Sequence, residues 1–362
     1  MKRVLVIGGY GNFGRFISAR LSNDPSIELI IAGRSLEKAQ RLAAKLNAQA
    51  EYIDVHARLP ERLAAIRPDI VIHTSGPFQN QGYDVAQACI AQGCHYIDLA
   101  DGTDFVANIT SLDDAARARS VMVISGASSV PCFSAALIDH YRASFKSLDS
   151  IDYGITTAQQ STRGLATTQA ILGYTGKPFT TLINGAVKTI YGWQGLRLRR
   201  YPHIGWRWLS NCAIPDLRLF PNRYPGIQTL RFRAGVELPL LHLGLWCLSW
   251  LVRLRLVRNM QCIAPVLLKI SDGFNRFGSA DSGFHMRLSG IGADGRAKDI
   301  CFELTARSND GPFIPCIPSV LLAQKIARGE LHQPGAQACV DLITLDEYLT
   351  AFRDLNITWQ VN

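Results

Sequence analysis

Three glycines near the start of the chain have the spacing of a phosphate-binding turn. Gly9, Gly11 and Gly14 form G-x-G-x-x-G between an apolar run at 4–7 and a helical pattern at 15–21. In such a turn the first glycine permits a tight bend, the second lets the backbone approach a pyrophosphate, and the third lets helix and strand pack closely. The phosphates then meet free N–H groups at the positive end of the helix. The pattern predicts a dinucleotide site, and the alternative is a glycine-rich turn without a ligand.

The end of the next apolar run, at 27–32, indicates which dinucleotide binds. About 20 residues beyond the glycines, NAD sites place a carboxylate on the ribose 2′-hydroxyl, whereas NADP sites accommodate the 2′-phosphate with an arginine. Here Gly33 is followed by Arg34 and Ser35, without a carboxylate. Because a guanidinium matches the geometry of a phosphate, we predict NADP(H) rather than NAD(H). The alternative is that Arg34 is solvated and that Ser35 only caps the helix predicted at 36–46.

The elements that must position these residues follow from the alternation of apolar and helical patterns. Strands are predicted at 2–7, 27–32, 50–55, 69–75, 95–100 and 121–126, and helices at 15–21, 36–46, 60–67, 82–91 and within 101–119. Strands joined by short helical crossovers form a doubly wound parallel sheet. We therefore predict an α/β fold with a Rossmann-type NADP-binding domain at 1–135.

The pattern changes after residue 135. Strand-like alternation at 150–157, 284–291 and 300–307 predicts a second α+β domain that contains a mixed sheet. This domain is expected to cover 136–312 and to serve substrate binding or dimerisation. Residues 315–327 return to helical spacing, so we expect 313–362 to pack back onto the first domain.

Composition indicates a globular protein and excludes a disordered one. The chain has 362 residues, of which 48% are hydrophobic and 19% charged, which is typical of a globular protein with room for two domains. Nine cysteines occur without C-x-x-C pairs or Cys/His spacing, so we expect reduced thiols, a cytoplasmic protein and no metal site. No signal-peptide pattern follows Met1.

The net charge of +9 is unevenly distributed, since eight arginines lie between 197 and 233. A basic stretch interleaved with tryptophans suits nucleic acid, an anionic lipid or an acidic substrate. No nucleic-acid motif accompanies it, so no nucleic-acid partner is predicted. A membrane-surface role and a merely solvated face remain as alternatives.

Residues 238–252 are mostly apolar and are followed by Arg253, Arg255 and Arg258. Fifteen residues are fewer than the ~20 that a helix needs to span a bilayer. Three interpretations of 238–258 stay open: a buried core helix, a contact in a homodimer, or a helix lying on the inner face of the membrane.

Three further segments follow predicted strands, where a sheet of this kind builds its active site. They lie at 74–78, 95–101 and 125–132. Together with the glycine turn and Ala-Gly-Arg at 32–34, they resemble the NADP-binding domain of the saccharopine dehydrogenase-like family over about residues 1–140. The resemblance implies a nicotinamide-dependent oxidoreductase, often dimeric. Members include saccharopine reductases, carboxynorspermidine dehydrogenases and trans-acting enoyl reductases that work on lipid-like chains.

The resemblance also implies roles for individual residues. The pyrophosphate would be contacted by Gly9, Gly11, Asn12, Phe13 and Gly14. The 2′-phosphate would be contacted by Arg34 and Ser35, and the adenine would lie near Asp54. The nicotinamide side would be lined by Ser75, Gly76 and Pro77.

The chain departs from the amino-acid-forming members after the sixth strand. Those members carry Asp-Pro-Gly, whereas this chain has Val130, Pro131 and Cys132. The missing carboxylate favours a hydrophobic or partly hydrophobic carbonyl or enoyl substrate. The alternatives are an amino-acid or polyamine dehydrogenase and a non-catalytic NADP-binding protein at a membrane surface or in a complex. Catalytic candidates are Asp98 and Asp101, with a structural hydrogen bond to the neighbouring loop as the other role for Asp98.

We also assign expected roles to four further polar residues. Arg163 and Lys188 are candidates to hold an anionic substrate from the second domain. His73 and His242 lie in apolar contexts and are expected to be core histidines.

Overall fold

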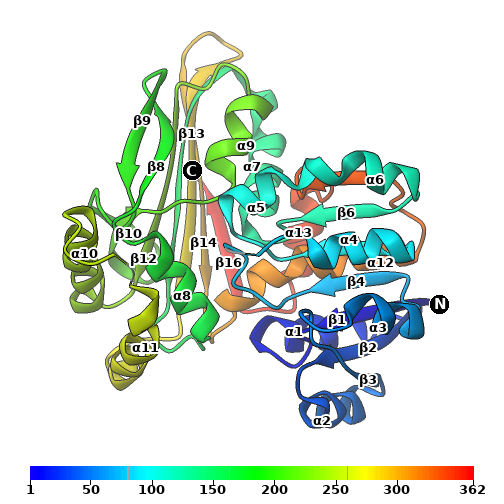
Figure 1. The fold of residues 1–362 in the computed structure, drawn as a ribbon. Coiled ribbons are helices and arrows are strands. Elements are labelled where there is room, and N and C mark those ends of the chain that lie inside the picture. Colours follow the sequence, from blue (N-terminus) through cyan, green and yellow to red (C-terminus); the bar gives the residue numbers. More distant parts are fainter. Residues whose placement is uncertain (80, 163, 259) are drawn as a thin grey trace. The chain divides into compact units, whose positions relative to one another are not determined.

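The structure is a computed structural model that describes every residue except 80, 163 and 259. The role predicted for Arg163 therefore lies outside the described residues. Contacts divide the chain into two compact units. The first unit contains Met1–Ala136 and Phe313–Tyr348, and the second contains Leu137–Pro312 and Leu349–Asn362. Each unit is built around a seven-stranded sheet of its own (Figure 1).

The sheet of the first unit is parallel throughout and has the order β3-β2-β1-β4-β5-β6-β15. The predicted doubly wound α/β fold is confirmed. The order reverses between β1 and β4, and ligands of such sheets bind at this reversal, beyond the carboxyl ends of the strands. The strands are β1 (Lys2–Ile7), β2 (Ile27–Gly33), β3 (Gln49–Tyr52), β4 (Ile70–His73), β5 (His95–Asp98), β6 (Met122–Ser125) and β15 (Gly335–Ala338).

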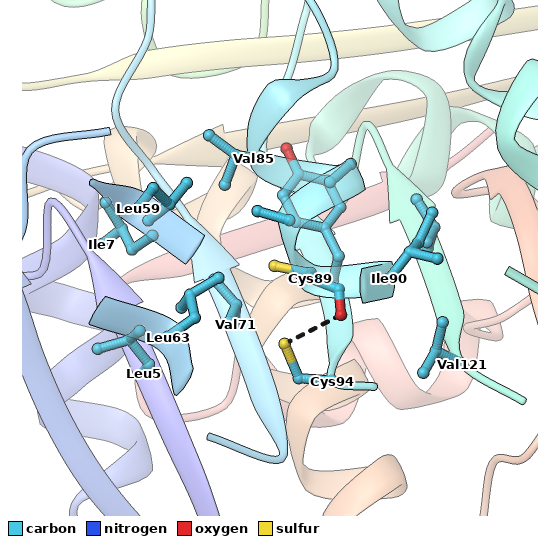
Figure 2. Close-up of a cluster of buried hydrophobic side chains, with 14 of the residues drawn as sticks. Leu5, Ile7, Leu59, Leu63, Val71, Val85, Cys89, Ile90, Cys94 and Val121 are labelled. Carbon is cyan, nitrogen blue, oxygen red and sulfur yellow. Dashed lines mark hydrogen bonds between the residues drawn. The ribbon is translucent and has the colours of Figure 1, made fainter. Parts of the chain in front are cut away.

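Helices flank this sheet, which is why its central strands are apolar on both faces. Leu5 and Ile7 of β1 pack into one core with Leu59 and Leu63 of α3 and with Cys89 of α4 (Figure 2). The helices are α1 (Asn12–Leu21), α2 (Leu36–Leu46), α3 (Leu59–Ile66), α4 (Asp84–Gln92), α5 (Thr103–Ala107), α6 (Asp113–Ala118), α12 (Ile317–Ala327) and α13 (Leu345–Ala351). The helix α7 (Ser134–Tyr141) begins in the first unit and continues into the second, and so does α13.

Several element boundaries differ from the predicted ones. The first helix begins at Asn12, three residues earlier than residue 15. The third strand ends at Tyr52, because the Ala57 N–H donates to the Asp54 carbonyl oxygen at 3.1 Å and closes a turn. Asp54 therefore follows the strand instead of belonging to it. The region 101–119 contains two helices, α5 and α6, separated by the 3₁₀ turn Ile109–Leu112.

The second unit contains the predicted mixed sheet, in the order β10-β11-β12-β7-β13-β14-β16. Its β12 and β7 pair in parallel and its other neighbours are antiparallel. The strands are β7 (Phe145–Thr157), β10 (Arg197–Tyr201), β11 (Gly205–Asn211), β12 (Thr229–Val236), β13 (Ser282–Gly292), β14 (Ala297–Ala306) and β16 (Ile357–Val361). A separate hairpin consists of β8 (Pro178–Ile183) and β9 (Ala186–Tyr191).

The expectation that all of 313–362 packs on the first domain is wrong for the C-terminal residues. β15 and α12 belong to the first unit, but Leu349–Asn362 belong to the second. The reason is β16, which pairs with β14 over five residues, from Ile357 opposite Ala306 to Val361 opposite Phe302.

The helices of the second unit are α8 (Leu165–Tyr174), α9 (Asp216–Arg223), α10 (Pro239–Arg253) and α11 (Ala264–Gly273). The apolar segment that we singled out at 238–252 forms α10. Among the helices in the described part of the chain, none is long and apolar enough to cross a bilayer.

Candidate functional site

The glycine turn connects β1 to α1 at the reversal point of the first sheet. Gly8 has a φ of +79°, and its N–H donates to the Ala32 carbonyl oxygen at 2.8 Å. A Cβ at Gly8 would lie 2.5 Å from Thr74 Oγ1. The left-handed residue of the turn is therefore Gly8, which the motif did not single out. Gly9 also belongs to the tight turn, because its N–H donates to the Val6 carbonyl oxygen at 3.2 Å and a Cβ there would lie 2.9 Å from that oxygen. Because Gly8 and Gly9 are adjacent, the sequence alone could not show which of the two adopts the left-handed conformation.

Gly14 and Gly11 are restricted for different reasons. A Cβ at Gly14 would lie 2.2 Å from the Gly8 carbonyl oxygen, so α1 approaches β1 too closely for any side chain. Gly11 has an ordinary φ of −72°, and a Cβ there would meet only the Gly8 oxygen, at 3.1 Å. Packing within the chain thus requires a glycine at position 14. At position 11 it gives only a weak reason for a glycine. An open cradle at Gly11 is what a close approach of pyrophosphate to the backbone requires.

The N-terminus of α1 presents unpaired donors. The N–H groups of Asn12, Phe13 and Gly14 have no acceptor in the described part of the chain, and no side chain caps the helix. Its first turn also contains no acidic residue. Such a terminus carries a partial positive charge and suits a phosphate group. The residues present therefore fit a dinucleotide pyrophosphate.

The end of β2 is held by a residue that the sequence analysis missed. Tyr10 Oη accepts a hydrogen bond from the Ser35 N–H at 2.8 Å, and its ring lies against Gly33, where a Cβ would come within 2.7 Å. Ser35 Oγ accepts from the Lys38 N–H at 3.4 Å and caps α2, as predicted. Arg34 is exposed and forms no hydrogen bond or ion pair with any residue that the structure describes. Its guanidinium is thus available for a ligand. Tyr10 lies inside the glycine motif, but no spacing rule assigns it a partner.

The loop after β4 lies beside the glycine turn. Thr74 donates to the Ile7 carbonyl oxygen from both its N–H and its Oγ1, at 3.0 and 2.9 Å. Gln81 Nε2 donates to the carbonyl oxygens of Ser75 and Pro77, at 2.9 and 3.0 Å. A Cβ on Gly8 would also come within 2.8 Å of Ser75 Oγ. The structure therefore brings Ser75, Gly76 and Pro77 to the reversal point.

Asp54 lies near the end of the neighbouring β3 and is half-buried. Its Oδ1 accepts from the His56 N–H at 3.1 Å, so the side chain helps to shape the turn after β3. The second carboxylate oxygen has no partner among the described residues. That Asp54 lies near the adenine of a bound cofactor remains a prediction.

Asp98, at the end of β5, is completely buried. Its Oδ1 accepts from the N–H groups of Ala100 and Gly126 at 2.9 and 2.8 Å and from Ser125 Oγ at 3.0 Å. Burial raises its pKa to about 6, although these hydrogen bonds favour the ionised form. This geometry matches the structural alternative, since the carboxylate ties β5 to the loop after β6. A catalytic role for Asp98 stays a prediction.

Asp101 differs from Asp98 because its side chain reaches solvent. Its Oδ1 accepts from Gln79 Nε2 at 2.9 Å. Desolvation by the surrounding protein nevertheless raises its pKa. A solvent-accessible acid with a raised pKa, close to the cofactor loops, suits general acid or base catalysis.

The remaining polar candidates of the first unit are buried. His73 Nδ1 lies 3.2 Å from Tyr96 Oη, and burial lowers the pKa of His73 to about 4. It is a neutral core histidine, as expected. The Cys132 side chain is also buried, which agrees with a packed thiol. In the part of the chain that is described, no group of three His, Cys, Asp or Glu side chains could hold a metal ion.

About half of the arginines in the basic stretch of the second unit pair with carboxylates of that unit. Lys188 is exposed on β9, and the core histidine His242 has its pKa lowered to about 4 by burial. Ion pairs of 3.1 Å or less join four of the arginines to carboxylates. They are Arg199–Glu303, Arg207–Glu237, Arg223–Asp139 and Arg233–Asp152. These four arginines are therefore neutralised within the second unit, whereas Arg197, Arg200 and Arg218 are exposed.

Comparison with known proteins extends this description. Residues 4–124 match the family described as the saccharopine dehydrogenase NADP binding domain. The trans-acting enoyl reductase of Mycobacterium leprae is 28% identical over 137 residues, a match that covers 35% of this chain and 33% of that protein. The chain thus matches about a third of the length of that relative.

Two solved structures are similar to the fold. Saccharopine dehydrogenase (L-Glu forming) from Saccharomyces cerevisiae superposes over 100% of both chains with a TM-score of 0.69 at 14% identity. Homospermidine synthase from Legionella pneumophila, solved in complex with NAD, has a TM-score of 0.59 at 9% identity and covers 100% of this chain and 91% of its own.

Proposed function

We propose, on the premise that this chain belongs to the saccharopine dehydrogenase-like family, that it is an NADP(H)-dependent oxidoreductase acting on a hydrophobic or partly hydrophobic carbonyl or enoyl substrate. The match over 4–124 supports this premise, and the likeness of the fold to saccharopine dehydrogenase agrees with it. A nicotinamide cofactor and an oxidoreductase activity belong to that family. The preference for NADP and the class of substrate are our proposals.

The preference for NADP rests on Arg34. This exposed guanidinium follows β2 directly, has no partner among the described residues, and stands where an NAD site would place a carboxylate. Arg34 would bind the 2′-phosphate, Gly11 and the first N–H groups of α1 would bind the pyrophosphate, and Ser75 to Pro77 would lie beside the nicotinamide. The bound cofactor supplies hydride transfer, and the protein supplies orientation and a proton donor or acceptor. Asp101 is the proposed proton-transferring residue, because its exposed carboxylate follows β5 and accepts a hydrogen bond from Gln79 of the loop after β4.

The cofactor proposal is tested by titrating the protein with NADPH and NADH and following cofactor fluorescence. In Arg34→Ala we expect the Kd for NADPH to rise about tenfold to a hundredfold, because a charge-assisted hydrogen bond contributes about 1.5–3 kcal/mol. The Kd for NADH should change little. Arg41→Ala is the matched control, since Arg41 is exposed on α2 and paired with Glu37. Equal losses for both cofactors in Arg34→Ala would contradict the proposed 2′-phosphate contact.

The substrate proposal rests on the loop after β6, where Val130, Pro131 and Cys132 replace a carboxylate-bearing segment. Without that carboxylate, the loop offers no anionic group to orient an amino or imine nitrogen. The similarity to a trans-acting enoyl reductase supports an apolar substrate, and it covers about a third of each protein. The likeness of the fold to saccharopine dehydrogenase and homospermidine synthase keeps amino-acid or polyamine chemistry as the second candidate.

A screen of NADPH oxidation separates these candidates. Long-chain enoyl thioesters and aliphatic ketones represent the first class, and imines formed from lysine and an oxo acid represent the second. Turnover of the apolar compounds alone supports the proposal. Turnover of the imines alone would overturn the substrate class but not the cofactor site. Tight NADPH binding without any turnover would favour a non-catalytic NADP-binding protein.

A further inference from the structure

Exposed apolar side chains are concentrated on α10, on α11 and on the segments that follow them. The described residues include eighteen large hydrophobic side chains that are classed as exposed, and nine of them lie between 240 and 277. Their exposed fractions range from 37% to 70%. They are Leu240, Trp250, Leu251, Leu254, Leu256, Ile263, Val266, Ile270 and Phe277. We call these nine side chains the outer apolar set. Such a concentration on a water-soluble domain typically marks an interaction surface.

The outer apolar set is not a consequence of poor packing. α10 and α11 bury a separate inner face with α8, in a small core of Leu172, Met260 and Ala264. Leu245 and Leu248 of α10 are among the residues that pack against it. The helices therefore already bury an apolar inner face, and the nine exposed side chains are not part of that core.

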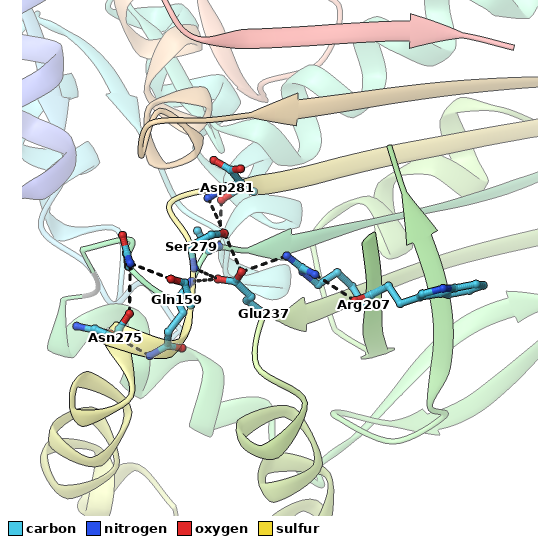
Figure 3. A network of polar contacts seen from close by, with 11 residues as sticks. Gln159, Arg207, Glu237, Asn275, Ser279 and Asp281 are labelled. Carbon is cyan, nitrogen blue, oxygen red and sulfur yellow. Dashed lines mark hydrogen bonds and ion pairs between the residues drawn. The ribbon is translucent and has the colours of Figure 1, made fainter. Parts of the chain in front are cut away.

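A partly buried polar network fixes both ends of the α10–α11 segment to the sheet (Figure 3). Glu237, directly before α10, accepts from the Gln159 and Ser279 N–H groups at 2.8 and 2.9 Å and pairs with Arg207 at 3.1 Å. Gln159 Nε2 donates to the Ser271 carbonyl oxygen at 2.7 Å and to Asn275 Oδ1 at 2.9 Å. Hydrogen bonds with fixed geometry hold the segment in place, so its outer side chains are not needed for this attachment.

The charge of this segment is one-sided. The helices α10 and α11 together contain one carboxylate, the exposed Asp272 near the end of α11. From Leu238 to Ser271 the sequence contains none, while Arg253, Arg255, Arg258 and Lys269 are basic. All four are exposed. Arg255 and Arg258 pair with no carboxylate that the structure describes. Arg253 lies over the rings of Tyr191 and Trp250, at 4.0 and 4.9 Å from their centroids. Apolar side chains, tryptophan and unpaired cations together are typical of helices that lie on anionic membranes.

A second copy of the chain is a poorer fit for this surface. In a two-fold symmetric dimer the same patch meets itself, so the arginines of one copy would face those of the other. Like charges in an interface oppose association. α10 has 15 residues, too few to span a bilayer of roughly 30 Å. A surface position on the membrane satisfies both constraints.

We propose that the outer apolar set and the basic side chains of α10, α11 and their connection bind the surface of an anionic phospholipid bilayer. The apolar side chains enter the boundary between headgroups and acyl chains, and Arg255, Arg258 and Lys269 contact lipid phosphates. The inference does not depend on the proposed oxidoreductase activity. If both hold, the enzyme meets apolar substrates at a membrane surface.

Co-flotation with vesicles tests this proposal. One vesicle contains phosphatidylcholine alone, and the other contains equal parts of phosphatidylcholine and phosphatidylglycerol. We expect binding to the anionic vesicle, weaker binding to the neutral one, and a loss of binding as salt is raised. The variant Arg255→Ser/Arg258→Ser should bind the anionic vesicle about tenfold or more weakly, because each basic residue near such a surface contributes about 1 kcal/mol. Leu254→Ser/Leu256→Ser should lose binding to a similar extent.

Matched controls keep the test specific. Val187→Ser/Leu198→Ser removes exposed apolar side chains elsewhere in the second unit, and Arg296→Ser removes a distant exposed cation; both should bind vesicles like wild type. Circular dichroism of each variant establishes folding. Binding that is unchanged in both test variants overturns the proposal. So does a dimer of the wild type in sedimentation that Leu254→Ser/Leu256→Ser converts to a monomer, because a second copy would then cover the surface.

Discussion

A single buried carboxylate, Asp98, should make the stability of the first unit depend on pH. Its pKa in the folded chain is raised to about 6 from an ordinary value of 3.8, because burial disfavours the charged form. The folded state therefore holds the proton more tightly than the unfolded state. This contribution to stability is complete below the ordinary pKa and is lost as pH rises through about 6. The shift corresponds to a loss on the order of 3 kcal/mol.

Asp98→Asn should remove this dependence while it keeps an acceptor for Ala100, Ser125 and Gly126. As the pH rises from 4 to 6.5, we expect the wild type to lose stability relative to Asp98→Asn. Above pH 6.5 the difference between the two free energies of unfolding should stay constant. Hydrogen exchange of β5 and β6 measures it. Asp114→Asn, which removes an exposed carboxylate from α6, controls for the lost charge. A parallel pH course for wild type and Asp98→Asn would show that the buried carboxyl does not titrate in this range.

At the scale of elements, the β1–α1 unit contains two glycines with separable purposes. Gly14→Ala places a Cβ 2.2 Å from a backbone oxygen, so α1 must move away from β1. We expect a loss of stability of about 1–3 kcal/mol or more. Gly11→Ala meets only the Gly8 oxygen, at 3.1 Å, in an ordinary backbone conformation. It should cost no more than about 1 kcal/mol, the order of a poor N-cap, yet it should abolish tight binding of NADPH and NADH alike.

Thermal unfolding followed by circular dichroism and cofactor titration together check this pair. The contrast is the informative result: one variant loses stability, and the other loses cofactor binding at nearly unchanged stability. If Gly11→Ala bound NADPH like wild type, the open space at Gly11 would not be the pyrophosphate cradle.

At the scale of the whole molecule, the two units offer independent reporters. All six tryptophans lie in the second unit, whereas all candidate cofactor residues lie in the first. Tryptophan fluorescence therefore follows unfolding of the second unit, and NADPH fluorescence follows the site of the first. A perturbation confined to one unit should move only one signal.

Gln159→Ala uses this separation. Gln159 is 1% exposed and donates to Ser271 and Asn275, so its removal takes a donor away from two half-buried acceptors. We expect the second unit to lose about 1–3 kcal/mol in urea unfolding, with an unchanged Kd for NADPH. Gln160→Ala removes an exposed neighbouring amide and serves as the control, with a smaller loss. A weakened NADPH affinity in Gln159→Ala alone would mean that the two units are energetically coupled.

The sequence by itself determined what depends on contiguous chain. Strand, glycine turn and helix between Lys2 and Leu21 follow one another directly, so their order and spacing predict the phosphate site. The same holds for Arg34, which follows β2, and for the parallel sheet, because handedness rules leave few ways to connect alternating strands and helices. The apolar segment at 238–252 was also visible, because its composition does not depend on its partners.

Only the tertiary structure decided matters that join distant residues. It showed that Gly8 is the left-handed residue and that Thr74, from the loop after β4, fills the space around it. It placed Asp98 in a hydrogen bond with Gly126 and paired β16 with β14 in the second sheet. It also neutralised Arg199 with Glu303. The physical reason is that hydrophobic periodicity records that a side chain is buried or exposed, but not which distant group it meets.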